Sequence, residues 1–326
     1  MRFFVLATFI ALAFSLSHSN SYYKSKYDSY LNKFNKEYSQ QEYRYRLSIF
    51  SENVDFIESE NKKGHSYTLG LTSFADISNE EYRARRSCSN MEKQVKEASR
   101  NVPNKVYEDL PESVDWRAVG AVTPVRDQNG CGSDWAISAT ACMEYTNFNA
   151  TGKLIQLSIQ QLIDCDQISV GCRGGLMSYA FRYVTENLGI CAEEDYPYTA
   201  KDGECDTNKC YSKGHISDYV VNNFFGKGGK PLKEAISEHV STISLDSKSE
   251  SFQHYTSGIF DATDCGHKVD LGAAGVGYGK EGDKEYFIVK VPFGTQWGEE
   301  GYMRLAYQDE GWGTCGENIS TAWSTW

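Results

Sequence analysis

The sequence predicts an α+β protein in which a helical half is followed by a half built from short strands. In the middle of the chain, apolar patterns indicate helices at residues 134–148, 158–164 and 177–186. From about residue 216 the pattern changes to short alternating runs that are typical of strands, at residues 241–245, 273–277, 286–290 and 301–305. Helical patterns first and strand patterns later indicate two packed halves.

The composition narrows the classes of function. The chain has 326 residues, of which 40% are hydrophobic, and its formal net charge is −11. An acidic balance argues against nucleic-acid binding as the default function. With only 28 glycines and six prolines, the chain is neither collagen-like nor of low complexity. Ten cysteines are many for a reducing cytosol.

Residues 1–19 are predicted to be a secretory signal peptide. Arg2 is followed by an apolar run from Phe3 to Leu16 and then by small polar residues. A permanent membrane anchor is the alternative, but it needs roughly 20 apolar residues. We therefore expect a protein without a membrane anchor, either secreted or held in a lysosomal or vacuolar lumen, where cysteines pair.

Residues 20–109 form a charge-rich front segment with 15 basic and 14 acidic side chains, whereas residues 110–326 hold 17 basic and 30 acidic ones. Within the front segment, apolar residues at three- and four-residue steps predict an amphipathic helix from about Gln41 to Asn61. Residues 91–109 are polar, include Pro103 and lack periodicity, so they are predicted to be a linker.

Ordered motifs make the chain resemble the papain-like cysteine proteases, in the layout of the cathepsin L branch. The front segment matches six positions of that family's prodomain helix: Glu42, Arg46, Phe50, Asn53, Ile57 and Asn61. A second prodomain motif is matched by Gly70, Phe74 and Asp76, with Thr72 where asparagine is usual. The body matches family motifs at residues 110–116, 124–128, 171–175, 195–198, 276–279 and 294–299.

The resemblance implies a papain-like fold of two subdomains, one helical and one barrel-like, which face each other across a peptide-binding cleft. It divides the chain into a signal peptide (1–19), an inhibitory prodomain (20–109) and a peptidase domain (110–326). The prodomain is then the first expected partner of the cleft. No cofactor is expected.

The family's chemistry needs a thiolate, a histidine that takes its proton and a group that orients the imidazole. At the nucleophile position the sequence has Asp134, and Cys131 stands three residues earlier, at a disulfide position. Leu271 occupies the histidine position and Val291 the orienting position. Only Gln128, the side-chain donor of the oxyanion hole, is retained.

The register at the histidine position is difficult to shift, because the motif at residues 276–279 and Cys265 both align without a gap. His267 is four residues from that position, about 13 Å along an extended strand. We therefore expect His267 to be an exposed loop residue. Phe293 replaces the family's aromatic lid over the triad with a different ring.

Asp134 could take part in other chemistry if a second carboxylate shared its proton, and Asp270 is the candidate partner. Neighbours on an extended segment point to opposite faces, which disfavours this dyad. The preferred interpretation is structural, with Asp134 capping the central helix.

The remaining positions carry structural expectations. The resemblance implies the disulfides Cys131–Cys172, Cys165–Cys205 and Cys265–Cys315. Cys142 is expected to be a buried free thiol, a Cys191–Cys210 bridge stays open, and Cys88 is unassigned. No spacing supports a metal site.

The sequons at Asn149 and Asn318 are candidate glycosylation sites. Gly174, Gly175 and Trp297 map to the family's substrate groove, although a tight turn also explains the glycines and packing explains the tryptophan. Arg173 and Ser244 line the same groove, so a retained pocket would not be the usual apolar one.

The sequence therefore predicts an inactive homologue of a cysteine endopeptidase that binds peptides or protease inhibitors. A hydrolase that works through Asp134 and a structural or storage protein of the lumen are the alternatives.

Overall fold

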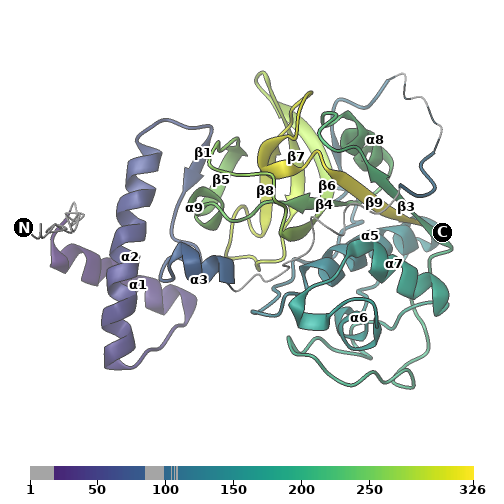
Figure 1. Cartoon of the computed structure of the whole chain (residues 1–326), viewed down its shortest axis with the longest axis horizontal. Helices are drawn as coiled ribbons and strands as arrows, with labels where there is room; N and C mark the ends of the chain where they lie inside the picture. Colours follow the sequence, from purple (N-terminus) through teal and green to yellow (C-terminus); the bar gives the residue numbers. More distant parts are fainter. Residues whose placement is uncertain (1–17, 85–98, 104, 106, 108) are drawn as a thin grey trace, which may run out of the picture.

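The computed structural model describes residues 18–84, 99–103, 105, 107 and 109–326, which form a helical front beside a two-part body (Figure 1). The apolar run of the predicted signal peptide, most of the predicted linker and Cys88 lie outside these ranges. Within them, no helix is long and apolar enough to cross a bilayer. The front comprises α1 (Asn20–Phe34), α2 (Gln40–Asn61), β1 (Tyr67–Leu69) and α3 (Asn79–Ala84).

Helices α1 and α2 pack through a small aromatic core that contains Tyr23, Tyr27, Tyr30, Phe50 and Val54. The helix predicted over residues 41–61 is confirmed as α2, but α1 was not predicted. Its three buried tyrosines recur at steps of four and three, a helical signal that the many polar residues around them obscure. The Ser19 side chain accepts a hydrogen bond from the Tyr22 amide, so the predicted end of the signal peptide coincides with a helix cap.

The helical half of the body is organised around α5 (Asp134–Thr151), whose first 14 residues are all buried. Around it lie α6 (Ile159–Cys165), the short 3₁₀ helix η1 (Gly171–Arg173) and α7 (Met177–Glu186). The three predicted helices are confirmed to within three residues at each end. Helix α5 ends at Gly152, whose positive φ of 71° favours glycine.

The other half is a seven-stranded sheet in the order β1-β5-β8-β7-β6-β2, with β4 also paired to β6. All pairs are antiparallel except β5 with β8. The strands are β2 (Val114–Asp115), β4 (Ser241–Leu245), β5 (Tyr255–Phe260), β6 (Leu271–Glu281), β7 (Lys284–Lys290) and β8 (Tyr302–Ala306).

A two-stranded sheet of β3 (Asp218–Asn223) and β9 (Ser320–Thr325) lies beside the helical half (Figure 1). The remaining elements are α8 (Lys230–Glu238), α9 (Glu250–Gln253) and the 3₁₀ helix η2 (Thr314–Gly316). The four predicted strands are confirmed, whereas β3, β5 and β9 were not predicted.

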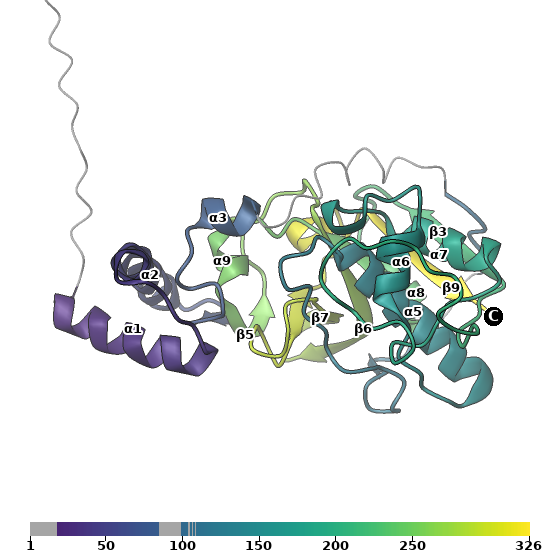
Figure 2. The same ribbon diagram turned by 90° about the horizontal axis from the view of Figure 1, so that it is seen from below.

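The front segment joins the body through the sheet, because β1 pairs with the edge strand β5. Ile57, Tyr67 and Leu69 of the front belong to the same hydrophobic core as the strands of the body. Figure 2 shows α1 and α2 extending away from the body while α3 lies beside α9. The contact therefore includes the short strand β1, the loop that follows it, the end of α2 and α3.

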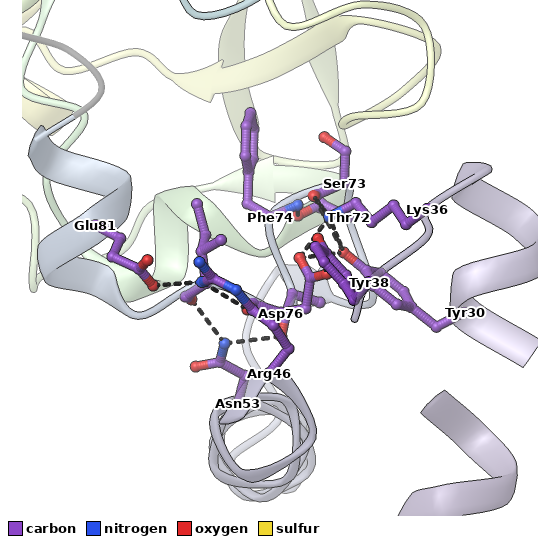
Figure 3. A network of polar contacts seen from close by, with 12 residues as sticks. Tyr30, Lys36, Tyr38, Arg46, Asn53, Thr72, Ser73, Phe74, Asp76 and Glu81 are labelled. Atoms are coloured by element: carbon purple, nitrogen blue, oxygen red, sulfur yellow. Dashed lines mark hydrogen bonds and ion pairs between the residues drawn. The ribbon is translucent and has the colours of Figure 1, made fainter. Parts of the chain in front are cut away.

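A polar network inside the front holds that loop in shape (Figure 3). The carboxylate of Asp76 is fully buried and accepts hydrogen bonds from Tyr30, Tyr38 and Lys36. From α2, the Arg46 guanidinium donates to the backbone carbonyl of Asp76, and the Asn53 amide donates to two more carbonyls of the loop. This anchoring presents Phe74 to the body.

Candidate functional site

Asp134 is the first residue of α5, and it faces the start of β6 in the other half of the body. Its Oδ2 atom accepts a hydrogen bond of 2.5 Å from the backbone N–H of Gly272, and the side chain is almost completely buried. The expectation that Asp134 caps the helix is wrong, because Ser133 is the N-cap residue and its side chain makes no capping bond. The carboxylate instead links the two halves.

Leu271 and Val291, which the motif spacing predicts at the histidine and orienting positions, are both buried in the core of the β half. Their side chains carry no atom that can donate or accept a hydrogen bond. The Val291 amide donates to the carbonyl of Gly301, which holds this segment against the turn before β8. The structure thus brings the two positions into one apolar cluster.

Phe293 and Trp297 complete this cluster with their rings at right angles, 5.2 Å apart. Trp297 also stacks on Phe252 at 5.4 Å and has no exposed surface. The assignment of Trp297 to a substrate groove is therefore wrong for this form of the protein, because a fully enclosed indole cannot contact a ligand. Packing is its role. From the front segment, Phe74 contacts Phe293 edge-on at 5.5 Å.

Gln128 lies next to this segment, since its backbone N–H donates to the carbonyl of Pro292. The backbone carbonyl of Gln128 accepts a hydrogen bond of 2.7 Å from the Tyr198 hydroxyl. The side chain is 7% exposed, and Oε1 has no hydrogen-bond partner among the described residues. The side chain predicted to serve the oxyanion hole is therefore enclosed in this structure.

The two glycines predicted in the groove are required by packing. Gly174 has a φ of +111°, a conformation that side chains strain to adopt. A Cβ atom on Gly175 would lie 2.6 Å from the Trp135 ring and 2.5 Å from the Ser169 hydroxyl. The tight turn after the Cys131–Cys172 disulfide therefore explains both glycines. Arg173, the residue before Gly174, is exposed, whereas Ser244 is buried.

Asp270 has partners different from those of Asp134. Its Oδ1 atom accepts hydrogen bonds from the backbone N–H and the hydroxyl of Ser247, at 2.8 and 3.1 Å, and Lys248 lies 3.7 Å from Oδ2. These contacts direct the carboxylate toward the turn after β4. His267 is confirmed as an exposed loop residue, and its ring stacks on Trp312 at 6.2 Å.

The structure confirms the three disulfides that the resemblance implies, Cys131–Cys172, Cys165–Cys205 and Cys265–Cys315, and it adds Cys191–Cys210. Cys142 is a free, buried thiol whose pKa is raised by burial. Among the described residues, no group of three or more His, Cys, Asp or Glu side chains could hold a metal ion.

The predicted glycosylation of Asn318 is incompatible with the folded structure. Its side chain is fully buried, and Nδ2, the atom that would carry the glycan, donates to the carbonyls of Gln308 and Gly311. Asn149 lies exposed in the last turns of α5.

A buried hydrogen-bond network next to the site was not predicted. Lys290, the residue before Val291, donates to the carbonyl and hydroxyl of Thr123 at 2.8 and 3.0 Å. The Thr123 hydroxyl in turn donates to Glu144 at 2.5 Å. Burial lowers the pKa of Lys290 to about 8 and raises that of Glu144. The sequence signal for this network was a lysine at the end of an otherwise apolar strand together with a glutamate inside an apolar helix.

The hydrogen bond between the two halves leads to a stability prediction. Asp134→Ala leaves the buried Gly272 N–H unpaired, so we expect the free energy of unfolding to fall by about 1–3 kcal/mol. Asp134→Asn keeps an acceptor oxygen and should lose less. Urea denaturation followed by tryptophan fluorescence measures both.

Ser138→Ala is the matched control for this experiment, because Ser138 is buried on the same helix and its hydroxyl has no hydrogen-bond partner among the described residues. An equal loss for Ser138→Ala and Asp134→Ala would contradict a specific role for the Asp134 carboxylate.

Comparisons with known proteins agree with this architecture. The model of the papain family cysteine proteases matches residues 110–324, and the model of the cathepsin propeptide inhibitor domain matches residues 27–82. The chain is 42% identical over 288 residues to cysteine proteinase RD21A of Arabidopsis thaliana, which covers 86% of the chain and 62% of that protein. It therefore spans about three fifths of the length of that relative.

Over 275 residues the chain is 41% identical to caricain of Carica papaya, covering 84% of the chain and 78% of caricain. Among solved structures, the proform of the ragweed pollen cysteine protease Amb a 11 superposes with a TM-score of 0.86 at 32% identity, covering 94% of this chain and 95% of that one. These matches run through the front segment as well as the body. The chain belongs to the papain family of cysteine proteases, with a propeptide inhibitor domain ahead of its two-part body.

Proposed function

We propose that this protein is a catalytically inactive member of the papain family that binds peptides or protease inhibitors in a secretory or vacuolar lumen. One observation carries the proposal: the three positions that should hold a nucleophile, a base and an orienting group hold Asp134, Leu271 and Val291. The latter two are buried among apolar side chains.

The chemistry of these side chains supports inactivity. A carboxylate is a poor substitute for a thiolate, and neither leucine nor valine can accept or deliver a proton. Triad members act as a unit. Without them, the oxyanion hole and substrate binding retain a rate enhancement of only about 10³–10⁴ over the uncatalysed reaction in water. Gln128 alone does not make a useful protease.

The Asp134 hydrogen bond to Gly272 argues against altered chemistry through this carboxylate. An attacking carboxylate needs a free oxygen, and a general base needs a free lone pair toward a water molecule. Oδ2 of Asp134 is engaged with the backbone of β6, and the residue is only 3% exposed, so little of the carboxylate is open to water or a substrate. Hydrolysis through Asp134 remains the competing hypothesis, and the assay below decides between them.

Turnover of a series of fluorogenic dipeptides between pH 3 and 7 tests the proposal. The prodomain is first removed with an added protease that is then inhibited, and caricain serves as the active reference. We expect no turnover above the blank at any pH. Turnover that Asp134→Asn abolishes would instead support the hydrolase.

Binding is tested separately, by calorimetric titration of the processed protein with a cystatin-type inhibitor and with a peptide library. Measurable binding is expected from the proposal. Absence of binding to every probe would favour a structural or storage role in the lumen.

A further inference from the structure

Residues 99–101 of the linker lie along the outer edge of β3, at the end of the molecule opposite α1 and α2 (Figure 1). Arg100 and Val221 form an antiparallel bridge. The Arg100 N–H donates to the carbonyl of Val221 at 2.8 Å, and the Val221 N–H donates to the carbonyl of Arg100 at 3.0 Å. The Asn223 N–H donates to the Ser99 hydroxyl at 3.2 Å. Because the other edge of β3 pairs with β9, these contacts extend the two-stranded sheet by one short segment.

Asp218, the first residue of β3, holds the two polar side chains that follow Ser99. Its Oδ1 atom accepts a hydrogen bond of 2.9 Å from the Arg100 guanidinium, and Oδ2 accepts one of 2.8 Å from the Asn101 amide. The Asn101 amide also donates to the carbonyl of Tyr219 at 3.2 Å. The guanidinium lies 4.5 Å from the centre of the Tyr219 ring, within the range of a cation–π interaction.

The backbone of Asn101 adds a second requirement. Its φ of +53° is a left-handed conformation, which asparagine adopts more readily than most residues. The edge of β3 therefore fits a segment that is extended at an arginine and turns away at the asparagine that follows it.

The contacts of residues 99–101 are open to water and can be exchanged. The Arg100 and Asp218 side chains are 49% and 45% exposed, and an exposed ion pair contributes little stability. Departure of the segment would leave the N–H and the carbonyl of Val221 on an open sheet edge. Such an edge is a template for another extended chain, which can add to it through main-chain hydrogen bonds.

We propose that the outer edge of β3 is a docking site for an extended segment of a partner protein in which asparagine follows arginine, and that residues 99–101 occupy this site in the precursor. The backbone groups of Val221 bind the extended main chain, while Asp218 and the Tyr219 ring select the arginine. The site uses none of the residues at the family's catalytic positions. It therefore stands or falls independently of the inactivity proposed above.

The test uses the full chain with Arg100→Pro, which removes both the N–H and the guanidinium that hold residues 99–101 on β3. An acetylated and amidated peptide with the sequence of residues 99–103 is then added at millimolar concentration, which is comparable to the effective concentration of a tethered segment. The readout is hydrogen–deuterium exchange at the Val221 amide, followed by NMR. The Val220 amide is the internal reference, because Val220 pairs with Trp323 of β9.

We expect the Val221 amide to lose protection in Arg100→Pro and to regain it when the peptide is added, while the Val220 amide stays protected. A peptide with alanine in place of arginine should bind about tenfold more weakly, because the ion pair and the cation–π contact are both lost. Asp218→Asn, added to the same full-chain variant, should weaken the arginine peptide more than the alanine peptide, which assigns the difference to the carboxylate.

Three results would overturn the proposal. Equal binding of the alanine and arginine peptides would show a sheet edge that does not select arginine. Failure of the peptide to protect the Val221 amide would show that residues 99–101 bind only because they are tethered. Protection in Arg100→Pro that rises with protein concentration, without peptide, would show that the edge pairs with a second copy of the chain. If Arg100→Pro fails to fold, Arg100→Glu, which repels Asp218, replaces it with the same expectations.

Discussion

Restoring all three family positions together, with Asp134→Cys, Leu271→His and Val291→Asn, is expected to raise peptide turnover from background to a level at least about 10³-fold higher. Asp134→Cys alone is expected to stay at background. The reason is chemical, because a thiol at this position needs a base to take its proton and a third group to orient that base.

The structure indicates that these substitutions also destabilise the fold. Asp134→Cys removes the acceptor of the Gly272 N–H, and Val291→Asn places a polar amide in an apolar cluster. The triple variant should therefore be less stable than the wild type, and its folding must be verified by denaturation before activity is measured.

The measurement is kcat/KM for a fluorogenic dipeptide after removal of the prodomain by an added protease. A second readout is the alkylation rate of the introduced thiol against pH, with the wild type as the control because it already contains Cys142. We expect a depressed thiol pKa only in the triple variant. Robust turnover by Asp134→Cys alone would show that another residue supplies the base and that Leu271 has been misassigned.

Replacing Glu317 by glutamine is expected to stabilise the protein at neutral pH. Glu317 has no exposed surface, and its carboxyl group folds over Gly313 beside the Cys265–Cys315 disulfide. No side-chain or backbone group of the described residues makes a well-formed hydrogen bond to it, although the amides of Thr314 and Glu317 itself favour its charged form slightly. Burial raises its pKa well above 4.5.

The folded state therefore keeps the proton of Glu317 at a pH where the unfolded chain has lost it. The stabilisation is fully present below pH 4.5, and it falls by about 1.4 kcal/mol per pH unit as the pH rises toward the folded-state pKa. Glu317→Gln has the same size and cannot ionise, so this loss should disappear.

Guanidinium denaturation between pH 4 and pH 8 measures the effect as the difference between Glu317→Gln and the wild type. Taking the difference cancels contributions from other groups, including His254, whose lowered pKa gives the opposite slope. Glu310→Gln, at an exposed glutamate in the same region, is the matched control. Parallel pH profiles for Glu317→Gln and the wild type would contradict a buried, protonated Glu317.

Local sequence patterns predicted the regular elements well where the apolar spacing was strong. Helices α2 and α7 have buried faces that repeat at helical steps, and α5 was predicted from a long apolar segment. Helix α1 was missed, since its buried residues are tyrosines among polar neighbours. Strands β3, β5 and β9 were missed because their burial depends on partners far along the chain, which alternation alone does not reveal.

Motif spacing alone carries the prediction that Asp134, Leu271 and Val291 stand at the family's catalytic positions, and the proposal of inactivity rests on that prediction. The surroundings of these three side chains could not be predicted from the sequence. Trp297 and Asn318 carry side chains that suit a groove and a glycan, yet both are fully buried. Burial is decided by every segment that packs on a residue, and no local pattern contains that information.

The sequence by itself thus determined the order of the prodomain and the body and three of the disulfides, and it predicts which chemical groups stand at the family's catalytic positions. Only the tertiary structure decided what those groups do. Asp134 accepts the backbone N–H of Gly272 from 138 residues away, and Phe293 contacts Phe74 of the front segment, which lies more than 200 residues earlier in the chain. Hydrogen bonds and desolvation act over a few ångströms in space, so residues distant in the chain determine them only once the chain has folded.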